Sequence, residues 1–335
     1  MRNAPPPPEP EETRPGGLVA TGANSRAVVA GGGGDAGVAA ALPAPIAQVE
    51  EVTTVGDTGR VWRRRLAYVF LIGYALLMFV PFAWTVITSF KTLPDSVRFS
   101  FIPQPFTTAA WEYAFNNLEP NIGRLFLNSF SIAIAVTITN VVLGSFAGYA
   151  FARLRFPGRG ILFLIVLATL MIPDQLRMIP VYVLTNGFGL GKGLGQMVSV
   201  VLVLAISATS VFLMRQYFLT IPQDLEEAAR IDGAGHWTTF LRVMLPLATP
   251  ALAAVTILQF QGTWNGFFWP FVLIRDQDLW TLPLGLTQFR LVGGFGTNWP
   301  PLMATVVIAT LPILVLYMFF QRYFVEGIAA SGVKG

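Results

Sequence analysis

The sequence predicts an all-α membrane protein that crosses the bilayer with six helices. Of the 335 residues, 54% are hydrophobic and only 12% are charged, about half the charge of an average soluble domain. The apolar residues collect in long uncharged runs, and about 20 such residues in a helix span the hydrocarbon core. One histidine and no cysteine are present, which excludes disulfides, thiolate metal sites and clusters of histidine ligands.

Residues 1–59 differ in composition from the rest of the chain. They contain a proline run at Pro5–Pro8 and a glycine run at Gly31–Gly34, and they show neither a helical nor a strand period. Such a segment buries too little apolar surface to offset its ordering entropy. We therefore expect a disordered cytoplasmic tail. It does not resemble a secretory signal, because no apolar core follows a basic start.

Residues 60–335 contain the expected membrane domain. The first apolar run follows an arginine cluster that ends at Arg65, and the fifth contains Pro246, Pro250 and Pro270. A loop at 221–242 and a C-terminal tail at 322–335 complete the domain. The expected spans are about 66–89, 125–152, 161–184, 197–219, 243–274 and 302–321.

Arginine placement predicts the orientation. With the N-terminus in the cytoplasm, 12 cations lie in inside segments and 7 in outside segments. The densest clusters, before the first span and between the second and third, agree with that choice. Both termini are thus expected on the cytoplasmic side of a prokaryotic inner membrane, with the lipid bilayer as a partner. The net charge of +4 is too small for a nucleic-acid surface, so we expect no nucleic-acid partner.

The loop at 221–242 predicts two short helices. The first runs from an N-cap at Asp224, with Glu226 and Glu227 in its first turn, to a left-handed residue at Gly233. The second begins near Gly235 and continues into the fifth span. Small residues on one face allow a partner to approach closely. This face holds Leu225, Ala228, Ala229 and Asp232, spaced i, i+3, i+4 and i+7.

This loop resembles the coupling loop of ATP-binding-cassette (ABC) importer permeases. The resemblance lies in Glu227-Ala228-Ala229, then Gly233, then Leu245-Pro246. Residues 264–270 (Trp-Asn-Gly-Phe-Phe-Trp-Pro) and 321–327 (Gln-Arg-Tyr-Phe-Val-Glu-Gly) resemble the carbohydrate-uptake branch, specifically the second, six-helix permease of the maltose type. The resemblance covers about residues 60–335 and implies the type I ABC importer permease architecture.

The resemblance also implies partners. The first loop helix, with Glu227 and Gly233, is expected to dock into a cleft on an ATPase subunit. The assembly would contain a homologous second permease, two ABC ATPase subunits and an extracytoplasmic solute-binding protein. ATP and Mg would be bound by the ATPases, because residues 187–192 fail the phosphate-loop pattern: Asn186 replaces its first glycine and Gly193 its Ser or Thr. The chain itself is expected to be no enzyme and to hold no cofactor or metal. The C-terminal tail either reaches between the ATPases or is a frayed end.

The fifth span predicts a substrate pathway. One side of this span carries a stripe of two amide and two aromatic side chains. Amides suit the hydroxyls of sugars and aromatic rings suit their C–H faces, although interhelical hydrogen bonding explains the two amides equally well. The opposite side carries Gly262 and Gly266, a spacing that permits close helix packing and recurs at Gly144 and Gly148. The stripe consists of Gln261, Trp264, Asn265 and Phe268.

Asp174 and Arg177 stand near the end of the third span. Each charge costs roughly 2.5–3.5 kcal/mol at the bilayer centre. Either the two pair and face the pathway, or the helix has already reached the outer interface, because Pro173 and Pro180 break the segment.

The sequence therefore predicts a permease that translocates a saccharide (mono-, di- or oligosaccharide) into the cytoplasm, driven by ATP hydrolysis on partner subunits. An ABC permease for another solute, such as glycerol phosphate or an amino acid, is the nearer alternative. An ion-coupled secondary transporter is the more distant one, since it needs membrane-embedded carboxylates and only Asp174 lies in a span.

Overall fold

A computed structural model describes residues 57–289 and 297–332. The regular elements of these residues are all helical, so the predicted all-α class is confirmed. Three described helices are long and apolar enough to cross a membrane, and three bent helix pairs raise the number to six if each pair is one span. The long helices are α1 (Asp57–Thr88), α4 (Ile122–Arg153) and α15 (Trp299–Gly332).

Three of the expected spans are broken helices. The breaks bend the chain by 102°, 41° and 75°. Pro173 precedes the first residue of α6, and a proline favours extended backbone in the residue before it, here Ile172. The pairs are α5 (Arg159–Ala168) and η2 (Thr169–Met171) with α6 (Asp174–Gly187), α7 (Gly195–Leu204) with α8 (Ala208–Thr220), and α10 (His236–Thr239), η3 (Phe240–Met244) and α11 (Leu245–Leu247) with α12 (Thr249–Trp264).

The expected fifth span, 243–274, is interrupted a second time. Helix α12 ends at Trp264, and α13 (Phe268–Leu273) begins after a three-residue gap. A single helix through this region was therefore a wrong expectation. The last helix also departs from the prediction, since α15 continues past the expected end of the span at 321 to Gly332. The expected N-terminal tail lies outside the described residues, except for the three residues that begin α1.

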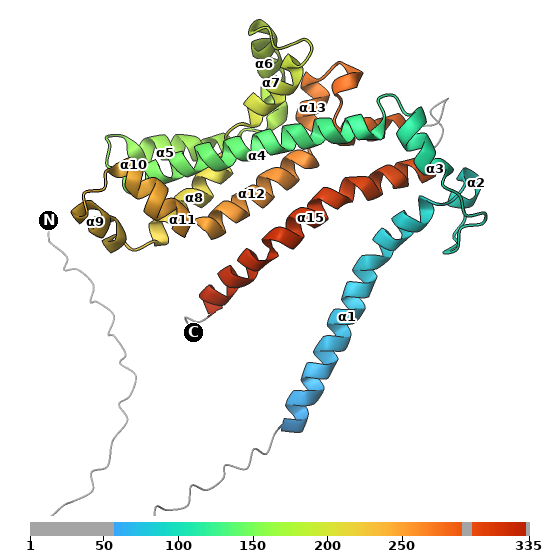
Figure 1. Ribbon diagram of the computed structural model, residues 1–335, viewed down its shortest axis with the longest axis horizontal. Coiled ribbons are helices and arrows are strands. Elements are labelled where there is room, and N and C mark those ends of the chain that lie inside the picture. The colour runs from blue at the N-terminus through green and yellow to red at the C-terminus, as the bar shows by residue number, and fades with distance from the viewer. Residues whose placement is uncertain (1–56, 290–296, 333–335) are drawn as a thin grey trace, which may run out of the picture. The chain divides into compact units, whose positions relative to one another are not determined.

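Helix α4 forms the centre of the packed region, beside α5, α8 and α12 (Figure 1). Its approach to α8 is close because Gly144 and Gly148 have no side chain. A Cβ on Gly148 would lie 2.6 Å from the Cβ of Met214, and one on Gly144 would lie 3.0 Å from the Cβ of Ser210. The predicted close packing at these two glycines is confirmed.

A buried amide supports the break between α7 and α8. Asn140 of α4 is fully buried, and its Nδ2 donates to the carbonyl oxygen of Leu204 (2.6 Å) while its Oδ1 accepts from the backbone N–H of Ser207 (2.8 Å). Gln259 of α12 donates from Nε2 to the Ser207 hydroxyl (3.0 Å). Backbone groups freed by a broken span need such partners inside a membrane.

Short elements cover the N-terminal end of α4. The segment between α13 and α15 returns there: the Asn128 amide donates to the carbonyl oxygens of Asp278 and Trp280, and the Ser129 hydroxyl accepts from the Leu282 N–H. These elements are η4 (Gln277–Leu279), α14 (Leu282–Gly285) and η5 (Leu286–Phe289). The region after α1 forms α2 (Leu93–Ser96) and α3 (Ala109–Glu112), which lie against α15, and η1 (Tyr113–Asn117), which contacts both α4 and α15.

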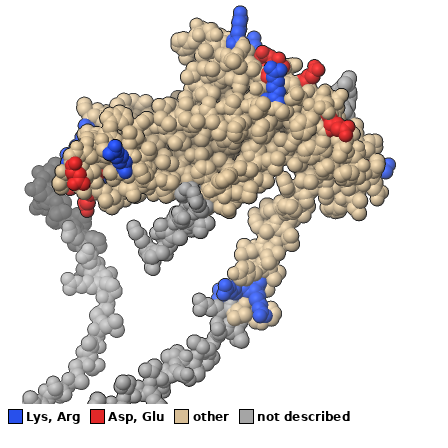
Figure 2. Space-filling model, in the orientation of Figure 1, with Lys and Arg blue, Asp and Glu red and all other residues tan. Residues whose placement is uncertain are grey.

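Charged residues of the long apolar helices lie near the helix ends. Figure 2 shows Lys and Arg gathered on the first turns of α1 and charged residues of both signs near α10, with a wide uncharged surface along the helices of the bundle. The apolar window of α1 has no buried residue, and that of α15 is 11% buried. These helices thus present apolar surface to lipid or to another membrane protein.

Candidate functional site

The loop at 221–242 folds into two short helices, as predicted. Helix α9 (Asp224–Ile231) is followed, after Asp232, by Gly233, whose φ of 83° is the expected left-handed conformation. There the Gly233 N–H donates to the Arg230 carbonyl and the Ala234 N–H to the Ala229 carbonyl, which satisfies the end of the helix. Asp224 is the first helical residue rather than the N-cap, and Gln223 holds the cap position without a side-chain bond.

Glu226 anchors α9 to the membrane helices, a role that the sequence analysis missed. Its carboxylate lies 3.4 Å from the guanidinium Nε of Arg153, and the two side chains are only 7% and 5% exposed. The Arg153 Nη2 also donates to the backbone carbonyls of Phe218 and Ile221. The weak signal for this pair was an arginine at the end of one span and a carboxylate just after another.

Most of the residues named from the coupling-loop resemblance are exposed in this structure. Glu227, Ala228, Asp232 and Gly233 are exposed, and Ala229 is half-buried. After the loop, Leu245 packs against the core and Pro246 lies in the first turn of α11.

Two large apolar side chains extend the exposed surface. Ile231 is 86% exposed and Trp237 is 68% exposed. Apolar groups of this size at the end of a helical bundle are typical of a surface that a partner covers.

The stripe expected on the fifth span does not form one face. Gln261 and Asn265 are exposed, but Trp264 is buried and donates from Nε1 to the Ala309 carbonyl (2.9 Å). Phe268 follows the helix break, so the i to i+7 spacing no longer places it above Gln261. Close packing at Gly262 and Gly266 was also wrong within this chain. A Cβ built on Gly262 meets no atom of another segment within 4 Å, and one on Gly266 would meet only backbone atoms of Gly262 and Thr263 in the last turn of α12.

Asp174 and Arg177 form an ion pair, as the first of the two sequence alternatives requires. That the pair faces the pathway stays a prediction. The Arg177 guanidinium also lies 5.7 Å from the centre of the Trp269 ring. Asp174 and Phe268 contribute to one cavity of about 250 Å³ beside the break between α12 and α13. The break thus joins two of the predicted pathway residues that are far apart in sequence.

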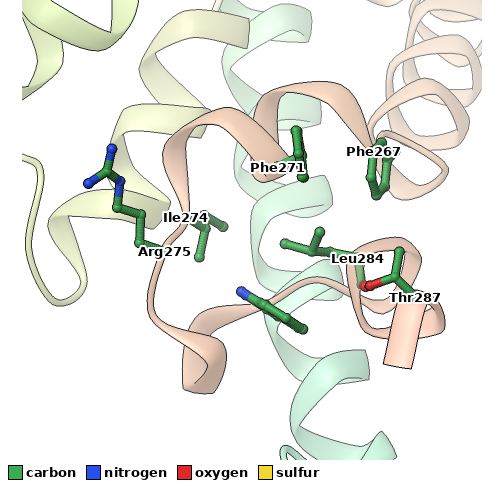
Figure 3. Close-up of a pocket in the computed structure, with 7 residues that line it drawn as sticks. Phe267, Phe271, Ile274, Arg275, Leu284 and Thr287 are labelled. Carbon is green, nitrogen blue, oxygen red and sulfur yellow. The ribbon is translucent and has the colours of Figure 1, made fainter. Parts of the chain in front are cut away.

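A second cavity of about 610 Å³ lies between α13 and the segment that contains α14. Figure 3 shows Phe267 and Phe271 on one side and Leu284 and Thr287 on the other. The two phenylalanine rings are stacked, with centroids 5.2 Å apart. Arg275 points away from them (Figure 3), and its guanidinium lies 4.9 Å from the Tyr182 ring centre.

Among the described residues, no group of three or more His, Cys, Asp or Glu side chains could hold a metal ion. The geometry offers a protruding, anchored pair of helices and two cavities lined mainly by apolar and aromatic residues. Fold and site together define a polytopic helical membrane protein with a candidate docking loop. The chain belongs to the family described as binding-protein-dependent transport system inner membrane component, whose model matches residues 140–329.

The relatives are transport permeases. The chain is 36% identical over 276 residues to an arabinooligosaccharides transport system permease of Halalkalibacterium halodurans, covering 81% of this chain and 97% of that protein. It is 34% identical to a diacetylchitobiose uptake system permease of Streptomyces coelicolor (77% and 84%) and 33% identical to an sn-glycerol-3-phosphate transport system permease of Yersinia pestis (78% and 94%). The predicted membership of the ABC importer permeases is confirmed.

The fold matches a solved transporter as well. A crystal structure of a bacterial ABC transporter involved in the import of the acidic polysaccharide alginate aligns with a TM-score of 0.68 at 24% identity, covering 80% of this chain and 98% of that one. The predicted permease architecture is thereby confirmed.

Proposed function

We propose that this chain is the membrane-spanning subunit through which a saccharide enters the cytoplasm, driven by ATP that two partner ATPase subunits hydrolyse. Family membership and the names of the arabinooligosaccharide and diacetylchitobiose relatives support the transport of sugar. The observation that carries the mechanism is the anchored helix α9. Its buried Glu226 is fixed to Arg153 while the rest of the helix stays open to a partner.

In this proposal α9 and α10 form a handle for an ATPase subunit. Ile231 and Trp237 supply the apolar contact, Ala228 and Gly233 allow close approach, and the exposed Glu227 offers a charge to the partner. When nucleotide closes the ATPase pair, the motion reaches α4 through Arg153. ATP and Mg belong to the ATPases, and the chain itself catalyses no reaction. A homologous second permease and an extracytoplasmic solute-binding protein complete the assembly, with both termini of this chain in the cytoplasm.

The glycerol phosphate relative supports a second candidate, an importer of a phosphorylated solute. Transport assays separate the two. The chain is co-expressed with its second permease, ATPases and binding protein, reconstituted in liposomes, and supplied with radiolabelled neutral arabino-, chito- and gluco-oligosaccharides or with sn-glycerol 3-phosphate. We expect uptake of a neutral oligosaccharide that requires ATP and survives a protonophore. Uptake that stops with the protonophore and ignores ATP would instead indicate a secondary transporter.

A further inference from the structure

The residues that line the cavity beside the break between α12 and α13 are suited to binding a small polar ligand. It measures about 250 Å³. Asp174 comes from α6, whereas the other polar and aromatic side chains come from α12 and α13. The lining residues that matter here are Asp174, Gln259, Gly262, Thr263, Phe268 and Trp269.

Two side chains, Gln259 and Asp174, offer hydrogen bonds in this wall. Gln259 is held in place by its bond to the Ser207 hydroxyl (3.0 Å), and that bond uses only one of the amide's four hydrogen-bonding positions. Asp174 is oriented by Arg177, and a carboxylate can accept from several hydroxyls. Trp269 contributes its ring rather than its donor, because the indole Nε1 is itself buried away from accessible space.

Aromatic rings complete the wall. Phe268 and Trp269 pack edge to face, with ring centroids 5.2 Å apart. Phe267 lines both this cavity and the larger one beside α14. Rings next to a carboxylate and an amide match a sugar, which has apolar C–H faces and a rim of hydroxyls.

The charges favour a neutral sugar over an anion. The charged group in the lining is the carboxylate of Asp174. The nearby guanidinium of Arg177 is paired with that carboxylate and lies over the Trp269 ring. A phosphate or uronate group would find no Lys or Arg among the lining residues, and the adjacent guanidinium is already paired with the Asp174 carboxylate.

We propose that this cavity binds one ring of a neutral saccharide, with Asp174 and Gln259 as hydrogen-bonding partners and Phe268 and Trp269 as the apolar wall. The inference rests on the proposed function. It adds a binding site within the chain and restricts the substrate at that site to neutral sugars, so glycerol phosphate and acidic sugars are not expected to bind in this cavity. Gly262 borders the cavity with open space at its Cβ position, which makes it a position for a probe.

A single engineered thiol tests occupancy directly. The chain has no cysteine, so the Gly262→Cys variant carries one thiol at the cavity. Gly160→Cys is the matched control, because Gly160 of α5 also has open space at its Cβ position and lies outside the cavity lining. Each variant is assembled in the reconstituted complex and alkylated with a maleimide, and mass spectrometry of this chain reports labelling. The probe is the neutral oligosaccharide that the wild-type complex takes up fastest, at millimolar concentration, with sn-glycerol 3-phosphate compared at the same concentration.

We expect the sugar to slow labelling of the Gly262→Cys variant about tenfold, as roughly 90% occupancy would, and to leave the Gly160→Cys variant unaffected. Glycerol phosphate should protect neither thiol. Equal labelling with and without a sugar that the complex transports would overturn the cavity assignment while leaving the proposed function intact. If no neutral sugar is transported at all, the proposed function itself fails, and this inference fails with it.

An uptake measurement tests the charge argument. Asp174→Asn removes the carboxylate charge and frees Arg177, so we expect kcat/KM for the neutral sugar to fall about tenfold and uptake of an acidic analogue of the same sugar to rise. Asp276→Asn, at an exposed position outside the cavity, is the control. An unchanged preference in the Asp174→Asn variant would contradict the proposal.

Discussion

Arg153 at the end of α4 and Glu226 in the first turn of α9 form a buried ion pair, with 3.4 Å between Nε and Oε1. The pair joins the loop at one end of the bundle to its most extensively packed helix. Arg153 also donates to carbonyls at the end of α8. One side chain therefore holds α4, α8 and α9 together, and a displacement of α9 cannot leave α4 behind without separating two buried charges.

The first prediction concerns this pair. Arg153→Met leaves the Glu226 carboxylate buried and without its nearest cation, and breaking a buried pair costs about 3–5 kcal/mol. We expect a lower melting temperature of the purified complex and less uptake per ATP hydrolysed. Arg155→Met, two residues further on and exposed, should leave the melting temperature unchanged. If both variants melt alike, the pair does not anchor the loop.

The second prediction concerns the contact between α4 and α8. Gly148→Ala would place a methyl group 2.6 Å from the Met214 Cβ and 2.9 Å from the Arg215 backbone nitrogen. The helices must separate, and overpacking of this kind costs about 1–3 kcal/mol. Gly73→Ala in α1, where nothing lies within 4 Å, should be neutral or slightly stabilising through helix propensity. Thermal unfolding in detergent compares the two; equal melting temperatures would show that the helices can adjust.

The glycine pairs show how far the sequence could predict the fold. Gly144 with Gly148 and Gly262 with Gly266 have the same spacing, yet the first pair contacts α8, whereas the second lines a cavity at the end of α12. The four-residue spacing of two glycines predicts that one helix face has no side chains to keep a neighbour away. Which neighbour fills that face depends on where the helix breaks, and Trp264 and Phe268 fell on different sides of a break that hydropathy alone does not reveal.

The loop was predictable for a different reason. Its two helices and the left-handed Gly233 depend on local chemistry, namely first-turn carboxylates, a short helical period and turn residues. The Arg153 and Glu226 contact depends on residues 73 positions apart in the chain. No local pattern marks such a pair, so the sequence placed Glu226 only among first-turn anions.

The third prediction concerns the exposed apolar residue at the end of α9. Ile231→Glu places a charge where the proposal puts an apolar ATPase contact, and burying an unpaired charge is strongly unfavourable. We expect much less ATPase subunit to co-purify with the permease, while the melting temperature of the permease itself stays unchanged because Ile231 is 86% exposed. Ile231→Val keeps the apolar surface and should retain the partner. Full ATPase recovery with Ile231→Glu would exclude this side chain from the interface.

The last prediction concerns the turn between α9 and α10. Gly233 has a φ of 83° and its N–H donates to the Arg230 carbonyl. Gly233→Pro removes that donor and fixes φ near −65°, so the turn must rearrange and α10 leaves α9 at another angle. We expect the chain to insert and the assembled complex to hydrolyse ATP, but sugar uptake per ATP to fall sharply in liposomes. Gly235→Ala, at a φ of −74°, serves as the control and should transport normally. Because the loop is proposed to transmit motion rather than to bind sugar, unchanged uptake by the Gly233→Pro complex would refute the coupling role of this turn.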